Sequence, residues 1–342
     1  MMVFIGGINL KNDANGGEEA KNQQMIAYFN KANIAAKIID THNWKLRLPI
    51  LFFQIFWHTF FAKNKNIYLS LSYGSTNKLL RFFNYFKISK RNSISYFVIG
   101  GKFHKWIQEN PQHVKNFKPL TAIYPESVAM VKSLNASGLQ NVKQVPNFKF
   151  IPKVNVVKDY EDIKFVFLSR LLPSKGTDLI LEATEKLNKS GFQNKFSVTF
   201  YGSFDEEFNK GYQALFKTKI EAISNIKYKG FLKLKALTNY EILAQYNAML
   251  FPTFWKGEGY PGVLIDAFIA HLPVIASDWN HNTEIVNAKN GIVIPSKNAA
   301  ALTDAMQKLI TDIDLLKTLE KGASQSVATY NIETVLSSII KS

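Results

Sequence analysis

The feature that most constrains the fold is an alternation of short apolar runs with longer amphipathic stretches, which continues along most of the chain. The apolar runs have the length of strands, and the stretches between them have the length of helices. Strands and helices that alternate in this way favour parallel sheets covered by helices. The sequence therefore predicts an α/β protein, and its 342 residues suit two domains of about 150 residues each.

The expected elements form two series. The strands expected in the first series are Met2–Gly6, Ala35–Ile39, Ile67–Leu71, Ser95–Ile99 and Thr121–Ile123, with a helix at Gly17–Asn30. The strands expected in the second are Lys164–Leu168, Ser197–Tyr201, Ile226–Lys229, Ala248–Phe251, Val274–Ala276 and Gly291–Ile294. Its helices are expected at Asp178–Lys189, Glu206–Ile223, Thr238–Gln245, Gly262–Ala270, Ala299–Thr311 and Ile332–Lys341. Two prolines within residues 144–152 indicate a connector, so we predict domains at 1–150 and 151–327.

Charge is distributed unevenly along this basic chain, which has a net charge of +16. Residues 41–108 contain eleven Lys or Arg and no Asp or Glu. The positive field of the first half favours anionic partners such as lipid headgroups, nucleic acid or phosphorylated substrates. There is no cysteine, which excludes disulfides, zinc–thiolate sites and cysteine nucleophiles. The N-terminus does not have the pattern of a signal peptide, so we expect a cytoplasmic protein.

The most apolar stretch is Leu46–Phe61, which has 16 residues and is short for a membrane span of about 20. Basic residues flank it, and Asn77–Lys87 adds a second stretch with cations opposite apolar side chains. One interpretation is a surface that touches an anionic membrane, which would place the protein at the inner face of the cytoplasmic membrane. The other is a buried helix with a solvated basic edge.

The densest candidate site is the segment from Glu258 to Asp278, which follows a predicted strand and opens a predicted helix. Ligands bind at the carboxyl ends of the strands in open parallel sheets, and a helix N-terminus offers unpaired N–H groups. Gly259 and Gly262 allow close approach of the backbone. Glu258 and Asp266 can face one crevice as acceptors for hydroxyl groups, although each residue taken alone is better explained as a solvated Glu or an ordinary helix Asp.

A second strand-to-helix loop, residues 169–176, carries Arg170 and Lys175. Two cations at the carboxyl end of a strand can clamp a diphosphate and neutralise the charge that develops on a departing nucleotide. Taken alone, they are equally well explained as exposed cations of a basic chain.

Together these segments resemble the family-4 glycosyltransferases of the GT-B fold. The resemblance is carried by Ser-Arg-Leu…Lys-Gly at residues 169–176 and Glu-Gly-Tyr-Pro…Asp-Ala…Leu-Pro-Val-Ile-Ala-Ser-Asp at 258–278. It extends more weakly to the Gly-rich loop at 15–19 and to Val-Pro-Asn at 145–147. It implies two Rossmann-like domains that face each other across a cleft, and a C-terminal helix, about 328–342, that packs back on the first domain.

The resemblance also implies roles for particular residues. Arg170 and Lys175 would hold the donor pyrophosphate, and Glu258 would hydrogen-bond the transferred sugar. Asp266 would hold the donor ribose. The other donor-binding residues would be Gly16, Gly17, Gly230, Phe231, Gly259, Tyr260, Pro261, Gly262 and Val263. The activity implied is transfer of a hexosyl group from a nucleoside diphosphate sugar, with uracil as the favoured base, to a saccharide acceptor, with retention and without metal or other cofactor.

Two departures from the family pattern concern the chemistry. The second of the family's paired glutamates is Asp266 here. Many relatives place a His in the first domain facing the sugar, where this chain has Gly100, Gly101 and Lys102 as acceptor-side candidates. Glu284 matches a position where the family often has Glu, and a carboxylate favoured by a helix dipole explains it equally well.

Other classes of protein fit less well. A nucleic-acid-binding protein would need aromatic side chains interleaved with cations, whereas the aromatic residues at 52–61 are contiguous and apolar. A GT-B module without catalytic activity, which binds nucleotide sugar or supports a partner enzyme, stays open. P-loop, GxSxG and HExxH motifs are absent, and Asp312 and Asp314 are interpreted as solvated helix surface.

Overall fold

The computed structural model describes residues 2–9, 16–61, 63–234 and 236–340. These form two compact units. One contains residues 1–150 together with 331–342, and the other contains residues 151–330. Each unit has its own sheet and its own core, so each is described separately.

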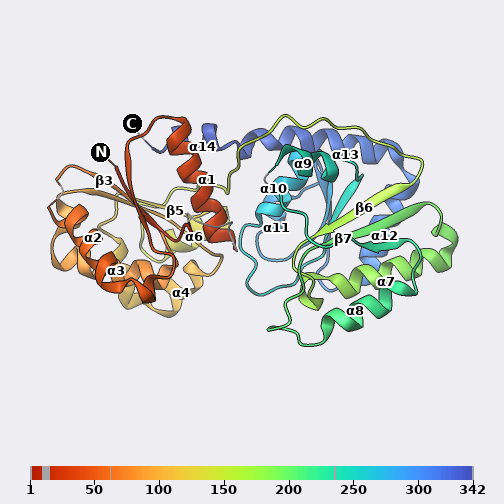
Figure 1. Cartoon of the computed structure of the whole chain (residues 1–342), viewed down its shortest axis with the longest axis horizontal. Helices are drawn as coiled ribbons and strands as arrows, with labels where there is room; N and C mark the ends of the chain where they lie inside the picture. Colours follow the sequence, from red (N-terminus) through yellow and green to blue (C-terminus); the bar gives the residue numbers. More distant parts are fainter. Residues whose placement is uncertain (1, 10–15, 62, 235, 341–342) are drawn as a thin grey trace. The chain divides into compact units, whose positions relative to one another are not determined.

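The first unit is built on a parallel sheet of five strands in the order β2-β1-β3-β4-β5 (Figure 1). The strands are β1 (Met2–Gly6), β2 (Ala36–Asp40), β3 (Asn66–Ser70), β4 (Ser93–Phe97) and β5 (Ala122–Tyr124). The three inner strands are buried along most of their length, which explains their continuous apolar sequences.

Helices cover both faces of this sheet, as parallel connections require. They are α1 (Gly17–Lys31), α2 (Leu48–Phe60), α3 (Tyr73–Tyr85), α4 (Phe103–Glu109), α5 (Val114–Phe117), α6 (Val128–Ala136) and α14 (Ile332–Ser337). The C-terminal helix α14 packs against α1 in a cluster that joins Ile332 and Leu336 to Met25 and Phe29. The last residues of the chain therefore complete the core of the first unit.

The second unit has a parallel sheet of six strands in the order β11-β10-β9-β6-β7-β8. The strands are β6 (Ile163–Leu168), β7 (Phe196–Tyr201), β8 (Ile226–Tyr228), β9 (Ala248–Phe251), β10 (Val274–Ser277) and β11 (Gly291–Ile294). The chain winds from β6 outward to β8, and then returns to place β9 on the other side of β6. The order of the strands therefore reverses between β6 and β9.

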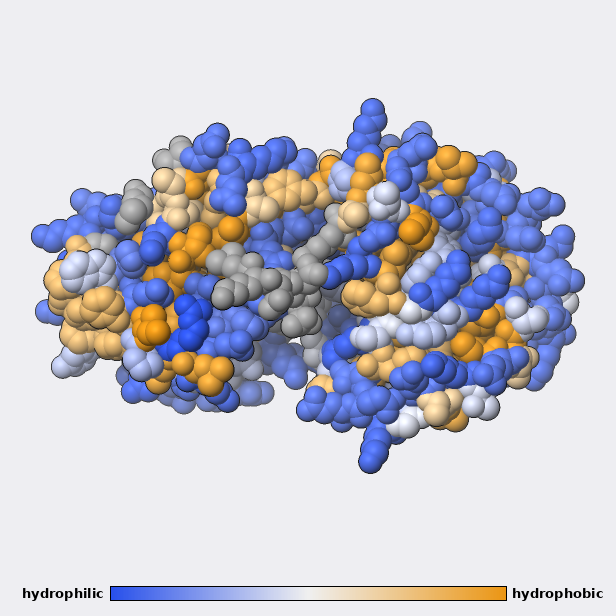
Figure 2. Space-filling model, viewed as in Figure 1, coloured by the Kyte–Doolittle hydropathy of each residue, from blue (hydrophilic) through white to orange (hydrophobic). Residues whose placement is uncertain are grey.

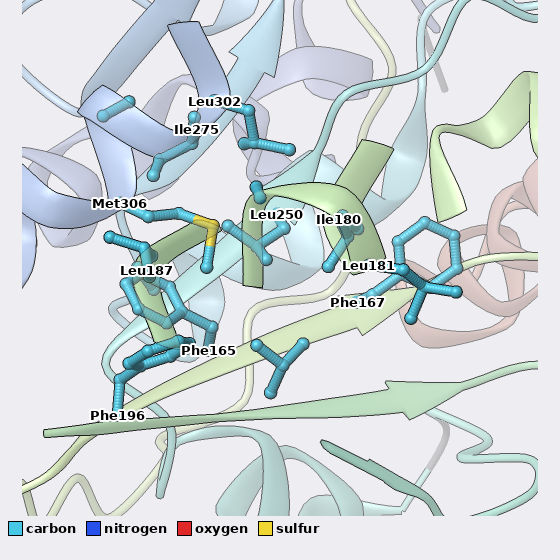
Figure 3. Close-up of a cluster of buried hydrophobic side chains, with 14 of the residues drawn as sticks. Phe165, Phe167, Ile180, Leu181, Leu187, Phe196, Leu250, Ile275, Leu302 and Met306 are labelled. Atoms are coloured by element: carbon cyan, nitrogen blue, oxygen red, sulfur yellow. The ribbon is translucent and has the colours of Figure 1, made fainter. Parts of the chain in front are cut away.

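Seven helices of the second unit are α7 (Thr177–Leu187), α8 (Tyr212–Glu221), α9 (Leu237–Leu243), α10 (Gly262–Ile269), α11 (Asn282–Ile285), α12 (Ala299–Thr311) and α13 (Ile313–Ser326). One face of the sheet is sealed by a cluster that includes Phe165, Leu250 and Ile275 from the strands (Figure 3). Ile180 of α7 and Met306 of α12 pack onto it. This core fixes β6 and β9 rigidly side by side.

The strands agree with the predicted segments to within two residues, whereas two helices differ. The helix predicted at Glu206–Ile223 begins only at Tyr212. The backbone N–H groups of Gly211 and Gln213 donate to the Glu206 carboxylate, and Gly211 has a φ of +80°, so residues before Tyr212 form a turn. The last helix, predicted to reach Lys341, ends at Ser337.

The interpretation of Leu46–Phe61 as a buried helix is wrong. The segment does form a helix, α2, but only Leu51 and Thr59 of that helix are buried. Pro49 lies in its first turn, where its missing N–H is tolerated. Most of the apolar side chains of α2 remain accessible to solvent.

Candidate functional site

The candidate site lies in the second unit, at the carboxyl ends of β6 and β9. These two strands are neighbours, but the chain leaves them in opposite directions because the strand order reverses there. In open α/β sheets the loops after such strands diverge and leave a crevice for ligands. The loop after β6 carries Arg170 and Lys175, and the loop after β9 carries Glu258. The topology therefore brings together residues that lie more than eighty positions apart in the sequence.

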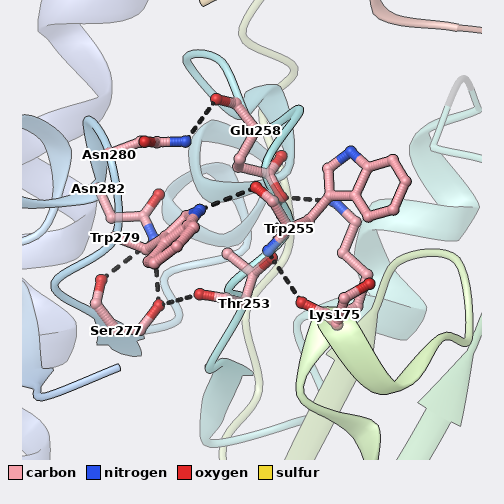
Figure 4. A network of polar contacts seen from close by, with 9 residues as sticks. Lys175, Thr253, Trp255, Glu258, Ser277, Trp279, Asn280 and Asn282 are labelled. Carbon is pink, nitrogen blue, oxygen red and sulfur yellow. Dashed lines mark hydrogen bonds and ion pairs between the residues drawn. The ribbon is translucent and has the colours of Figure 1, made fainter. Parts of the chain in front are cut away.

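Lys175 and Glu258 form a buried ion pair at the centre of this site (Figure 4). The Lys175 Nζ atom lies 2.5 Å from Glu258 Oε2, and the two side chains are only 7% and 11% exposed. The Thr253 hydroxyl donates to the same carboxylate oxygen at 3.0 Å. A buried carboxylate needs such partners because desolvation of a lone charge is costly. The pair holds a cation and an anion within reach of one ligand.

The backbone around Glu258 is fixed by the last residue of β10, the next strand of the sheet, and by residues that follow it. The Trp279 indole donates to the Trp255 carbonyl at 2.8 Å. The Asn280 side-chain amide donates to the Glu258 carbonyl at 3.0 Å (Figure 4). The Ser277 hydroxyl donates to the Thr253 carbonyl. Sequence reasoning missed these supports, because only the sheet order reveals that the loop after β10 lies beside the loop after β9.

The loops after β6 and β9 touch each other through their backbones. The Phe254 N–H donates to the Ser174 carbonyl at 2.8 Å. Gly176 has a φ of +85°, and a Cβ added there would lie 2.5 Å from the Pro252 carbonyl oxygen. Glycine is therefore required at position 176 for two reasons, its left-handed conformation and the close approach of Pro252.

We expect Gly176→Ala to lower the free energy of unfolding by about 2–4 kcal/mol, from left-handed strain plus overpacking. Gly191→Ala is the matched control, because Gly191 has a φ of +87° and open space around its Cβ direction. It should cost only about 1–2 kcal/mol. Urea unfolding of both variants measures the two losses of unfolding free energy. Equal losses would show that the close approach of Pro252 does not add to the cost at position 176.

Arg170 lies in the same loop as Lys175 but has different neighbours. Its Nη1 atom is 2.8 Å from Asp205 Oδ2, and its side chain is 42% exposed. The guanidinium lies over the Trp255 ring at 5.3 Å, and the Phe208 ring meets the same indole edge-on at 5.6 Å. Asp205 and Trp255, which the sequence did not single out, thus orient the arginine.

Asp266 is the fifth residue of α10 and is buried. The Tyr240 hydroxyl donates to Asp266 Oδ1 at 2.6 Å. Burial, and then the Asp266 charge, raise the pKa of Tyr240 far above its usual value, so the phenol stays protonated and holds the carboxylate. The structure therefore gives Asp266 a protein partner, and its predicted role toward a ribose stays a prediction.

The remaining donor-side residues of the second unit lie in the loop after β9, at the start of α10 and in the loop after β8. Tyr260 is buried, Pro261 precedes α10, and Gly262 and Val263 form its first turn, where N–H groups are free of helical partners. Gly230 follows β8, and its carbonyl accepts from the Gly202 N–H at 2.8 Å. The next residue, Phe231, is 68% exposed, which suits an aromatic platform for a base. Gly259 completes this group and lies between Glu258 and α10.

The acceptor-side candidates lie in the first unit, also at carboxyl ends of strands. Gly100 has a φ of +83° and, with Gly101 and Lys102, connects β4 to α4. Gly16 and Gly17, which were predicted to bind the donor, also lie in the first unit, where Gly16 is the N-cap of α1 and Gly17 its first residue. Residues 10–15 of the Gly-rich loop lie outside the described residues. Burial raises the pKa of Glu18, in the first turn of α1, to about 7.

Two other residues that the sequence analysis discussed can be placed in the structure. The Asp312 side chain accepts from the Leu315 N–H and caps α13. Glu284 lies 3.4 Å from His281 Nδ1, and its role in the site stays a prediction. Across the ranges that the structure describes, no three His, Asp or Glu side chains are grouped so that they could hold a metal ion.

Comparison with known proteins finds a family model that matches part of the chain, including this site. Residues 162–312 match the model of the family described as glycosyl transferases group 1. The matched segment contains both loops of the site, Arg170 to Lys175 and Glu258 to Asp266. The fold of the whole chain, with two Rossmann-like units, is that of the GT-B glycosyltransferases.

Individual proteins are similar to longer parts of the chain. The chain is 25% identical over 239 residues to a poly(ribitol-phosphate) alpha-N-acetylglucosaminyltransferase of Staphylococcus aureus, covering 69% of this chain and 45% of that protein. It is 24% identical over 178 residues to the S. aureus capsular polysaccharide biosynthesis glycosyltransferase CapH, covering 50% and 48%. The chain therefore spans about half the length of these curated relatives. The structure of Anabaena HepE in complex with UDP matches 99% of this chain and 98% of that one, with a TM-score of 0.71 and 14% identity.

Proposed function

We propose that this protein is a glycosyltransferase that moves a hexosyl group from a nucleoside diphosphate sugar to a saccharide acceptor. The observation that carries the proposal is the buried pair of Lys175 and Glu258, placed where the strand order reverses and inside the segment that matches glycosyl transferases group 1. UDP is the favoured nucleotide, since the similar HepE structure holds UDP. Two relatives named for polymer glycosylation support a saccharide acceptor.

In the proposed reaction, the bond between the anomeric carbon and the diphosphate oxygen breaks, and the nucleoside diphosphate leaves with the electron pair. Arg170 and Lys175 neutralise the charge that develops on the diphosphate. Glu258 accepts hydrogen bonds from hydroxyl groups of the sugar, and N–H groups at the start of α10 bind nearby oxygens. An acceptor hydroxyl forms the new bond and loses its proton to the departing phosphate oxygen. The proposal includes retention of configuration, no metal, and a membrane-associated or lipid-linked acceptor in the cytoplasm.

The first test is a thermal-shift panel of UDP, GDP, ADP, CMP and their sugar conjugates in EDTA. We expect UDP and one UDP-sugar to raise the Tm by several degrees when the ligand is present at about 100 times its Kd. Stabilisation by GDP compounds alone would identify a GDP-sugar as the donor and would leave the proposed glycosyltransferase activity unchanged. No shift with any nucleotide, in a folded sample, would contradict the proposal and favour a module without donor binding.

A further inference from the structure

The first unit exposes a group of large apolar side chains that has no counterpart in the second unit. Eighteen large hydrophobic residues are exposed among the described residues, and ten of them lie within residues 44–86. They are Trp44, Leu46, Leu48, Ile50, Phe52, Phe53, Trp57, Phe61, Tyr85 and Phe86, which we call the α2 surface. Figure 2 shows hydrophobic side chains gathered over the region where α2 and α3 lie. Patches of this kind mark sites of interaction.

The α2 surface is held in place by aromatic packing beneath it. Phe56 and Phe60 stack on each other with ring centroids 4.6 Å apart, and both meet the Phe86 ring of the α3 end at 6.4 and 5.6 Å. Phe53 and Trp57 lie one turn apart on α2, with exposed fractions of 63% and 55% and centroids 6.0 Å apart. The inner aromatic rings thus anchor the helix, and the outer ones point to solvent.

Cations surround the α2 surface without any carboxylate among them. Lys45 stands between Trp44 and Leu46, Lys63 follows Phe61 by two residues, and Lys87 follows Phe86 directly. All three lysines are exposed. In the part of the chain that the structure describes, no Lys or Arg of residues 41–91 forms an ion pair with a carboxylate. The cations are therefore available to an external anion.

The charge decides which partner fits. A second copy of the chain would bring an identical basic surface, and like charges across a two-fold interface are repulsive. Protein interfaces are also depleted in lysine. A bilayer interface, in contrast, accepts aromatic and aliphatic side chains between headgroups while anionic headgroups attract lysine.

The length of α2 decides how it would lie. Its 13 residues span about 20 Å, too short to cross the hydrocarbon layer. No helix of the described residues is long and apolar enough to cross a membrane. A short helix that is apolar on its outer side and flanked by lysine suits the plane of the interface.

We propose that the α2 surface docks this protein onto membranes that contain anionic phospholipid. Phe53 and Trp57 enter the boundary between headgroups and acyl chains, and Lys63 and Lys87 meet the lipid phosphates. The surface belongs to the first unit and contains none of the candidate donor residues of the second. Docking is therefore independent of whether the protein transfers sugar.

The test is co-sedimentation of the full chain with vesicles of phosphatidylcholine alone or of an equal mixture with phosphatidylglycerol. We expect binding to the mixed vesicles only, with a loss at high salt. Phe53→Ser with Trp57→Ser should lower partition by roughly tenfold or more, since each side chain contributes a few kcal/mol of burial at most. Lys63→Glu with Lys87→Glu should lower it by about tenfold or more.

The matched controls lie on the second unit. Val157→Ser with Leu215→Ser removes two exposed apolar side chains, and Lys210→Glu with Lys217→Glu reverses two exposed charges. Both should leave vesicle binding unchanged. All variants should keep wild-type UDP affinity, which separates docking from the proposed activity.

Two results would overturn the proposal. One is indifference of binding to phosphatidylglycerol and to the Phe53 and Trp57 substitutions. The other is a wild-type protein that does not bind vesicles and sediments as a dimer, while the Phe53→Ser, Trp57→Ser variant sediments as a monomer. The α2 surface would then bind a second copy of the chain.

Discussion

Replacing Glu258 by glutamine is expected to lower the rate of sugar transfer by about 100-fold, the penalty for losing a group that positions the substrate. The amide keeps the size of the side chain and one oxygen that can accept from Lys175, but it loses the charge and the second acceptor. We expect kcat to fall more than KM changes. Initial rates with the UDP-sugar identified by thermal shift measure both constants.

Glutamine is preferable to alanine at position 258 because of the buried ion pair. Alanine would leave the Lys175 ammonium, 7% exposed, without its partner, which costs about 3–5 kcal/mol and could unfold the protein. Glu182→Gln is the matched control, since Glu182 pairs with Lys186 on the exposed surface of α7. Near-normal transfer by Glu258→Gln, with Tm unchanged, would remove Glu258 from the proposed mechanism.

Much of the fold could be predicted because parallel strands in a covered sheet are continuously apolar. β1, β9 and β11 have the bounds that the sequence predicts, and each is flanked by glycine, proline or polar residues. The start of α8 could not be predicted in this way. Side-chain bonds from Glu206 to the backbone favour a turn over a helix, and hydrophobic periodicity does not register such bonds.

The site shows the same division between local and long-range information. The motifs around Lys175 and Glu258 mark their loops, and the sheet order places the two side chains 2.5 Å apart. Trp279 and Asn280 were not predicted, because their hydrogen bonds to the Glu258 loop depend on β10 lying beside β9. A sequence pattern identifies the loops that carry the functional side chains. Neighbouring loops hold these side chains in position, and only the topology shows which loops are neighbours.

The exposure of α2 is another result that sequence alone left open. An apolar helix is ordinarily buried, and the sequence allowed that interpretation. In the structure the helix uses Leu51 and the Phe56–Phe60 side for packing, and leaves the other side uncovered. Composition gives the amount of apolar surface, whereas only packing shows which part stays exposed.

The second large effect is expected from Arg170→Gln combined with Lys175→Met. Each cation would make charge-assisted hydrogen bonds to the diphosphate, worth about 1.5–3 kcal/mol each, so the Kd for UDP should rise by at least about 100-fold. The Kd for uridine should stay within about threefold, because the nucleoside carries no phosphate for the clamp. Calorimetric titration of both ligands gives the ratio. Lys217→Gln with Lys308→Gln is the control for the lost charge, since both lysines are exposed and lie on the helices α8 and α12, outside the loops that carry the site.

Arg170→Gln alone keeps this prediction testable if the double variant fails to fold. The arginine side chain is 42% exposed, so its loss should cost little stability, while Lys175→Met leaves the Glu258 carboxylate buried without its cation. We expect the single variant to weaken UDP by about tenfold and uridine hardly at all. Equal weakening of UDP and uridine would mean that Arg170 supports the fold of the loop through Asp205 and Trp255, and does not bind the diphosphate. A selective loss for UDP would place the diphosphate at the carboxyl end of β6, beside the carboxylate of Glu258.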